Sequence, residues 1–137
     1  MRKYYIPKII PLEDFVRESS LRFLTQVWRN FGSFSYLRNP PYMRRINGEN
    51  YAEDGNHRCV WKMINGILTI NAEEEAMDES VERVTLITSQ SVRERGINSF
   101  HDLAKRVKNP GQYSPEGPVT HRITREDLAN PKYFLRV

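Results

Sequence analysis

The residues best suited to chemistry lie in one short turn, Asp54-Gly55-Asn56-His57-Arg58. Gly55 permits a sharp or left-handed backbone just before a predicted helix, and the first amides of a helix have no intrahelical partners. Those amides and the helix dipole attract an anion, and the Arg58 guanidinium pairs bidentately with phosphate. Asn56 and His57 add hydrogen-bonding side chains. The turn therefore predicts a phosphate site formed by Gly55, Asn56, His57 and Arg58.

Asp54 stands just before this turn and has three candidate roles: it holds Arg58, binds a metal, or acts as a base. A purely structural interpretation is equally open. In it, Asp54 or Asn56 caps the helix, Arg58 forms an ordinary ion pair and His57 has no catalytic part. Glu13, near the start of the first predicted helix, is a second candidate base or metal ligand if it faces the same cleft.

A β-hairpin is expected to carry the chain into the turn. Its strands are predicted at residues 42–46 and 49–53, joined by Asn47-Gly48. Asn-Gly between two extended runs favours a two-residue turn, because both turn positions need a positive φ. The chain break Asn39-Pro40-Pro41 precedes the first strand. This hairpin would deliver Asp54 and Gly55 at the end of a strand.

A helix and a buried strand are expected to follow the turn. The helix is predicted over residues 57–65, with Gly66 ending it, and the strand over residues 67–72, which are apolar and β-branched. Strand, tight turn, helix, glycine and strand in this order predict a compact β-α-β unit. The fold class predicted for the chain is α/β in the α+β sense, with a small mixed sheet surrounded by helices.

Elsewhere the periodicity predicts a strand over residues 8–12 and a helix over 12–31 that ends at Gly32. The aromatic and aliphatic stripe of this helix is expected to pack in the core. The remaining predictions are a strand at 82–88, short helices at 89–95, 99–108 and 124–129, a polar loop at 111–123 and a docking tail at 132–137.

Composition indicates one ordinary globular domain spanning residues 1–137. Of the 137 residues, 39% are hydrophobic and 28% charged, and the net charge of +4 leaves nucleotide or nucleic-acid partners open. Cys59 is the only cysteine, which excludes an intrachain disulfide. No run reaches the roughly 18 apolar residues of a membrane span. We therefore expect a cytoplasmic protein with no membrane partner.

Residues 51–58, Tyr-Ala-Glu-Asp-Gly-Asn-His-Arg, with the helix, Gly66 and the strand that follow, resemble the ParB/sulfiredoxin-like superfamily. Residues 9–15, Ile-Ile-Pro-Leu-Glu-Asp-Phe, are similar to the opening strand and helix of that family. The resemblance covers residues 5–75, the expected core, and leaves residues 76–137 as an extension packed on it. It implies that Gly55, Asn56, His57 and Arg58 bind the phosphates of a nucleotide such as ATP, ADP or CTP.

The turn also departs from the patterns of two branches of this superfamily. ParB partition proteins carry Gly-Glu-Arg-Arg here, and sulfiredoxins carry Gly-Cys-His-Arg with the catalytic cysteine where this chain has Asn56. Cys59 lies three residues further on, so sulfiredoxin activity is not expected. Free-serine kinases have the similar Asp-Gly-His-His-Arg. ParB-like nucleases share the fold, and fold alone does not choose among these activities.

Three functions follow as hypotheses. The first is a nucleotide-binding protein, extending to a phosphotransferase, with Asp54, His57 and Glu13 as candidate catalytic residues and magnesium as a candidate cofactor. The second is a DNA-binding protein or ParB-like nuclease. The third is a non-catalytic regulatory or interaction protein of phage, plasmid or toxin type. The candidate nucleic-acid contacts of the second hypothesis are Arg44 and Arg45 on the hairpin, Arg2, Lys3 and Lys8 near the start of the chain, and Lys105, Arg106 and Lys108.

Overall fold

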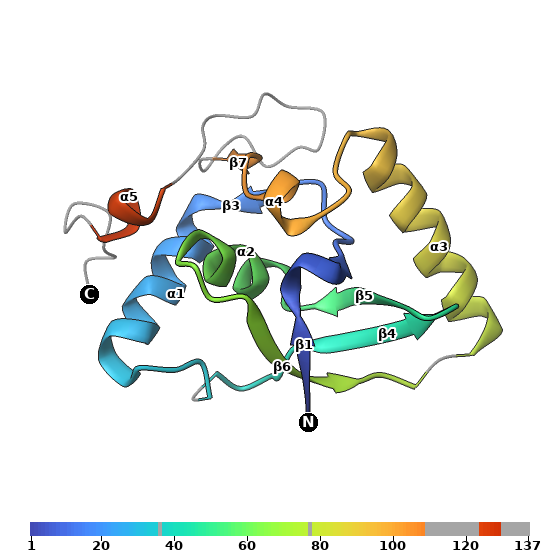
Figure 1. The fold of residues 1–137 in the computed structure, drawn as a ribbon, viewed down its shortest axis with the longest axis horizontal. Helices are drawn as coiled ribbons and strands as arrows, with labels where there is room; N and C mark the ends of the chain where they lie inside the picture. Colours follow the sequence, from blue (N-terminus) through green and yellow to red (C-terminus); the bar gives the residue numbers. More distant parts are fainter. Residues whose placement is uncertain (36, 77, 109–123, 130–137) are drawn as a thin grey trace.

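The computed structural model describes residues 1–35, 37–76, 78–108 and 124–129. Its main sheet contains five strands in the order β1-β6-β4-β5-β2 (Figure 1). These strands are β1 (Arg2–Tyr5), β2 (Ile9–Ile10), β4 (Tyr42–Ile46), β5 (Glu49–Asp54) and β6 (Thr69–Glu74). A small parallel pair, β3 (Val16–Arg17) and β7 (Val107–Lys108), lies apart from it.

The described helices surround this sheet. They are the short 3-10 helix η1 (Ile6–Lys8) and α1 (Glu18–Phe31), α2 (Asn56–Ile64), α3 (Glu79–Glu94), α4 (Phe100–Leu103) and α5 (Arg125–Ala129). The sheet mixes antiparallel pairs, β1–β6 and β4–β5, with parallel pairs, β2–β5 and β4–β6. The predicted α+β class with a small mixed sheet is confirmed. None of the described helices is long and apolar enough to span a bilayer.

The hairpin forms where the sequence predicted it. Asn47 and Gly48 join β4 to β5 with φ values of 52° and 80°, the positive values that such a turn needs. The helix after the turn, α2, starts one residue earlier than expected. The strand β6 pairs in parallel with β4, so β4 lies between β5 and β6 in the sheet. The predicted β-α-β order is therefore present, but its two strands are not neighbours.

The first long helix begins at Glu18, six residues after the predicted start at Leu12. Two contacts hold the intervening chain extended. The Leu12 amide donates to the Asn56 side chain, and Val16–Arg17 pairs with Val107–Lys108. Backbone groups used in these long-range bonds are not available for helical bonds. The helix ends as predicted, because Gly32 has a φ of 68° and its amide donates to the Trp28 carbonyl.

Part of the aromatic stripe on α1 is exposed, which corrects the expectation that the whole stripe packs in the core. Leu24 and Val27 are buried and Trp28 packs against the core, whereas Phe23 and Phe31 are 47% and 53% exposed. Trp28 contacts the rings of Phe34 and Trp61 at centroid distances of 5.0 Å. The helix therefore buries one side and presents two phenylalanines to solvent.

The strand predicted at 82–88 is wrong, because these residues belong to the helix α3. The Asp78 carboxylate caps this helix by accepting a 2.9 Å hydrogen bond from the Val81 amide. Its buried residues Thr85, Ser89 and Val92 follow a helical spacing, while the β-branched run that suggested a strand lies mostly on the exposed side. Capping and long-range packing outweigh the weak intrinsic β-propensity.

The last two short helices have the predicted caps. The Ser99 hydroxyl accepts from the Asp102 amide before α4, and the Thr124 hydroxyl accepts from the Asp127 amide before α5. The helix α4 ends at Leu103 rather than near 108, since Val107–Lys108 forms β7. Val92, Phe100 and Leu103 join the same hydrophobic core as the first half of the chain. The predicted loop at 111–123 and the tail after residue 130 lie outside the described residues.

A candidate anion-binding cleft

The turn between β5 and α2 has the backbone that the sequence predicts. Gly55 has a φ of 94°, in the left-handed region, and a Cβ at this position would lie 2.7 Å from the Cβ of Pro41. Glycine is therefore required both by the dihedral angle and by the close approach of the chain at Pro41. This approach brings the segment before β4 against the turn, and with it Arg38 and Asn39.

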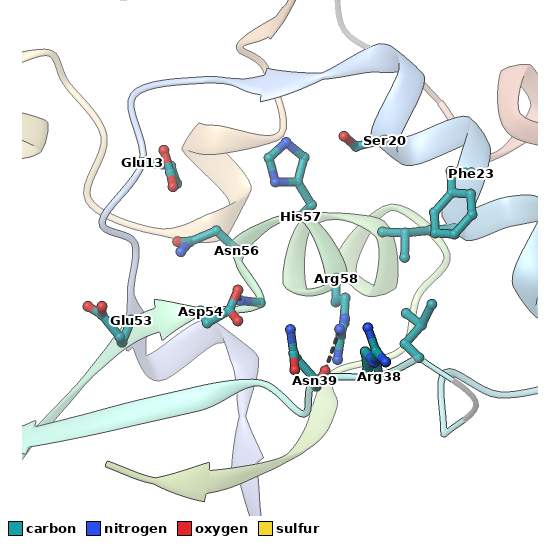
Figure 2. Close-up of a pocket in the computed structure, with 13 residues that line it drawn as sticks. Glu13, Ser20, Phe23, Arg38, Asn39, Glu53, Asp54, Asn56, His57 and Arg58 are labelled. Atoms are coloured by element: carbon teal, nitrogen blue, oxygen red, sulfur yellow. Dashed lines mark hydrogen bonds between the residues drawn. The ribbon is translucent and has the colours of Figure 1, made fainter. Parts of the chain in front are cut away.

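A cleft of about 360 Å³ opens over this turn (Figure 2). Its walls come from the turn, from α1 and from the segment before β4. The carboxylates of Glu13, Glu53 and Asp54 lie on one side, and Arg38 and Arg58 lie on the other. The lining residues also include Ser20, Phe23, Leu24, Leu37, Asn39, Gly55, Asn56 and His57.

The start of α2 offers uncapped amides to this cleft. The first helical hydrogen bond runs from the Cys59 amide to the Gly55 carbonyl at 2.9 Å. No side chain caps the amides that precede it, those of Asn56, His57 and Arg58, within the described residues. Such amides, together with the helix dipole, create a positive potential at this end of the helix.

The side chain of Asn56 is a structural element. It is only 4% exposed, its Oδ1 accepts from the Leu12 amide at 3.2 Å, and its Nδ2 donates to the Ala52 carbonyl at 3.0 Å. These two bonds tie the extended segment at Leu12 to the hairpin. Asn56 can therefore serve an anion through its backbone amide, while its side chain is already engaged.

His57 is held as a neutral hydrogen-bond acceptor. Its Nε2 accepts a 3.0 Å bond from the Arg17 amide, the residue before α1. Burial, aided by the charge of Arg17, lowers the pKa of His57 from its ordinary 6.5 to about 4. The proton of the neutral ring therefore resides on Nδ1. His57 can donate a hydrogen bond from this nitrogen, but it carries no positive charge at neutral pH.

Stability should fall as the pH is lowered from 7 to 5. The unfolded imidazole takes up a proton near pH 6.5 and the folded one near pH 4, so the unfolded state binds more protons between these values. The expected loss in the free energy of unfolding at pH 5 is about 2 kcal/mol. Urea unfolding at both pH values measures it. The variant His57→Gln, whose amide oxygen can still accept from Arg17, should lose this pH dependence; an unchanged dependence would contradict the assignment.

Arg58 does not pair with Asp54. Its Nη2 donates to the Asn39 carbonyl at 2.6 Å, and burial lowers the pKa of its guanidinium without removing its charge. The Asp54 carboxylate accepts instead from the Gly55 amide at 2.7 Å. One bond to a carbonyl leaves four of the five guanidinium N–H groups for other acceptors. Arg58 is therefore a charged donor that lines the cleft.

The acidic side of the cleft gathers carboxylates from two segments. Burial, followed by the neighbouring charges of Asp14, Asp54 and Glu53, raises the pKa of Glu13. Burial and nearby acids also raise the pKa of Glu53, although its carboxylate pairs with Arg44 at 2.8 Å. Among the described residues, no group of three or more His, Cys, Asp or Glu side chains is arranged to hold a metal ion.

Cys59 takes no part in the cleft. It is fully buried inside α2, and burial raises the pKa of its thiol to about 12. The thiolate is the reactive form of cysteine, so this side chain is inert near neutral pH. Cys59 therefore does not replace the catalytic cysteine that sulfiredoxins carry at the position of Asn56.

Three of the candidate nucleic-acid residues, Arg44, Arg106 and Lys108, make contacts within the protein. Arg44 is engaged by Glu53, Glu75 and Thr85 at 2.8, 3.2 and 2.7 Å. Arg106 donates to the Asp14 carbonyl, and Lys108 is fully buried with its ammonium 4.8 Å from the centroid of the Phe15 ring. Arg45 and Lys105 are exposed.

Sequence reasoning missed several residues of the cleft, among them Ser20, Phe23 and Arg38. Ser20 and Phe23 come from α1, and Arg38 comes from the segment before β4. Phe23 looked like a core residue because its spacing in α1 is helical. The sequence does contain one signal for Arg38. It directly precedes Asn39-Pro40-Pro41, and this segment must lie close to the turn because Pro41 contacts Gly55.

No family model and no curated protein matches the chain. Two of the solved structures similar to it are protein Atu1540 from Agrobacterium tumefaciens and sulfiredoxin from Arabidopsis thaliana. The first is 12% identical with a TM-score of 0.48, over 74% of this chain and 60% of that chain. The second is 20% identical with a TM-score of 0.42, over 63% of this chain and 98% of that chain.

The chain aligns with only 60% of the length of Atu1540. Both TM-scores are below 0.5, and neither likeness bears on activity. What the cleft does must follow from its own residues.

Proposed function

We propose that the cleft binds the phosphate groups of a nucleotide. The observation that carries this proposal is that one cleft is lined by the uncapped start of α2 and by two arginines, Arg58 and Arg38. Phosphate is the anion that such a combination of backbone donors and a planar guanidinium suits best. The Nδ1 proton of His57 adds a neutral donor.

Phe23 supports a nucleotide over a bare phosphate. Its ring is 47% exposed and lines the same cleft as Gly55 and Arg58. An exposed aromatic ring offers a stacking surface for a base, and aromatic pairs contribute about 0.5–1.5 kcal/mol beyond their buried area. The ligand class we propose is therefore a nucleoside di- or triphosphate such as ATP, ADP or CTP.

The carboxylate side suits magnesium that arrives with the phosphates. Magnesium is usually held by one or two protein carboxylates and by substrate phosphates, and it keeps several waters. The negative charges that raise the pKa of Glu13 show a local excess that a cation would relieve. Asp54 is the residue that we expect to face such an ion.

Glu13 is the candidate general base of the cleft. Should the bound nucleotide donate a phosphoryl group, Glu13 is the base we expect to accept the proton of the attacking hydroxyl. Its raised pKa makes it a better proton acceptor than an ordinary glutamate. His57 does not suit that task, because its Nε2 is occupied by the Arg17 amide.

An amide NMR titration with ATP, ADP and CTP, with and without magnesium, tests the proposal. Saturable shifts of the amides of residues 55–59 with one nucleotide are the expected result. If the chemical shifts of these amides do not change at millimolar nucleotide, the turn is a structural helix start and the proposal is wrong. Inorganic pyrophosphate in a parallel titration separates phosphate recognition from base recognition.

Phe23→Ala should weaken ATP binding by about 2–10-fold, the loss expected for one stacked ring. Binding of pyrophosphate should stay unchanged, because the phosphate donors are untouched. Isothermal titration calorimetry measures both affinities. Phe31→Ala is the matched control, since Phe31 is also exposed on α1 but does not line the cleft. If the two variants change the affinity for ATP equally, Phe23 does not contact the bound base.

A further inference from the structure

A second hollow, which shares no lining residue with the cleft, is lined mainly by positively charged residues. It has a volume of about 370 Å³ and lies between β1 and the β4–β5 hairpin. We call it the basic groove. Four of its seven lining residues are cations and none is acidic. The lining residues are Arg2, Lys3, Tyr4, Tyr5, Lys8, Arg45 and Asn50.

The curl of the sheet brings these residues together. β1 and β2 are at opposite edges of the five-stranded sheet, yet only the three residues of η1 separate them in sequence. The sheet must therefore bend so that its edges approach each other. Asn50 pairs with Ile9 on one side and with Arg45 on the other, which sets Lys8 near Arg45. Figure 1 shows β1 crossing in front of this bent sheet.

The charges of the groove are poorly neutralised. Lys3, Lys8 and Arg45 are exposed and make no ion pair among the described residues. Arg2 pairs with Glu74 at 3.7 Å, but both side chains are largely in solvent, where such a pair contributes little. The neighbouring Arg44, in contrast, is neutralised by two glutamates, Glu53 and Glu75. Clustered cations without counter-charges favour an anionic partner.

Tyr5 supplies the second feature of the groove. Its ring is 48% exposed, although it belongs to a strand whose neighbour Tyr4 is buried. Cations that track a phosphodiester backbone, together with an aromatic ring on which a base stacks, are the usual means of binding single-stranded nucleic acid. A base paired within a duplex would not present its face to this ring.

We propose that the basic groove binds single-stranded nucleic acid, with Lys3, Lys8 and Arg45 on the phosphates and Tyr5 under an unpaired base. Three phosphate contacts fit the three unpaired cations. The groove shares no lining residue with the anion-binding cleft. The proposal therefore stands whether or not the cleft binds nucleotides.

Fluorescence anisotropy with a labelled twelve-nucleotide oligo(dT) and its RNA counterpart, at several salt concentrations, tests the proposal. Three contacts predict a slope of log Kd against log salt of magnitude about 2, because each single-strand contact contributes about 0.7. Arg45→Ala and Lys8→Ala should each weaken binding several-fold and reduce the slope by about 0.7. Tyr5→Ala should weaken binding about 5-fold or more without changing the slope.

Two controls make the result specific. Arg83→Ala removes an exposed arginine of α3 and should leave oligonucleotide binding within twofold. Arg58→Ala disables the cleft and should also leave it unchanged, which separates failure of this proposal from failure of the nucleotide site. Circular dichroism confirms that each variant is folded. The proposal is overturned if Arg45→Ala and Lys8→Ala behave like Arg83→Ala, or if anionic lipid vesicles bind with the same variant dependence while oligonucleotides do not.

Discussion

Replacement of Arg58 by alanine should weaken nucleotide binding by about 10–100-fold. Hydrogen bonds to charged groups contribute roughly 1.5–3 kcal/mol each, and Arg58 is a charged donor that lines the cleft from the first turn of α2. The fold should survive, since the one hydrogen bond of the Arg58 side chain to the described residues goes to the Asn39 carbonyl. Isothermal titration calorimetry with ATP and with pyrophosphate measures the change.

Arg58→Lys sharpens this test. Lysine keeps the positive charge but loses the planar fork, so an intermediate affinity is expected if the guanidinium contacts phosphate bidentately. An affinity equal to that of the unchanged protein would mean that charge alone matters. If Arg58→Ala leaves ATP affinity within twofold, phosphate does not bind at this turn.

Gly55→Ala should lower the free energy of unfolding by about 2–4 kcal/mol. A left-handed φ of 94° costs a residue with a Cβ roughly 1–3 kcal/mol. The new methyl group would also lie 2.7 Å from the Cβ of Pro41. Two carbon atoms that are not bonded cannot approach so closely, so the turn or the segment at Pro41 must move. Urea unfolding measures the loss, and nucleotide affinity should fall with it.

Gly66→Ala is the matched control for this variant. Gly66 also has a positive φ, 74°, but among the described residues no atom beyond its own chain neighbours lies within 4 Å of a Cβ placed there. It therefore reports the cost of the dihedral angle alone. The difference between the two variants isolates the contact with Pro41. Equal losses would show that this contact carries no constraint, and that the position of Arg38 and Asn39 over the cleft depends on other interactions.

Local patterns predicted the elements whose signals are complete within a few residues. Asn47-Gly48 specified the hairpin, because both residues adopt the positive φ that the turn requires. Gly55 and the residues after it specified a strand end and a helix start, and Gly32 specified the end of α1. The caps at Ser99 and Thr124 were equally local. Each of these signals depends on backbone geometry and on hydrogen bonds to near neighbours.

Long-range contacts decided the elements that the patterns missed. The extended segment before α1 depends on Asn56 and on β7, both far away in the sequence. The helix α3 depends on its cap at Asp78 and on which of its sides becomes buried, whereas its sequence contains a β-branched run. A helical or strand pattern does not reveal which partner surface exists, so it cannot choose between these outcomes.

The sequence by itself determined that a turn with Gly55 and Arg58 would open a helix with uncapped amides, because glycine, helix start and guanidinium are local features. Only the tertiary structure decided which other residues line that cleft. It brought Phe23 and Arg38 to the turn, engaged the side chains of Asn56 and His57 in structural bonds, and buried Cys59. Position and protonation follow from neighbours distant in sequence, and those neighbours exist only once the chain has folded.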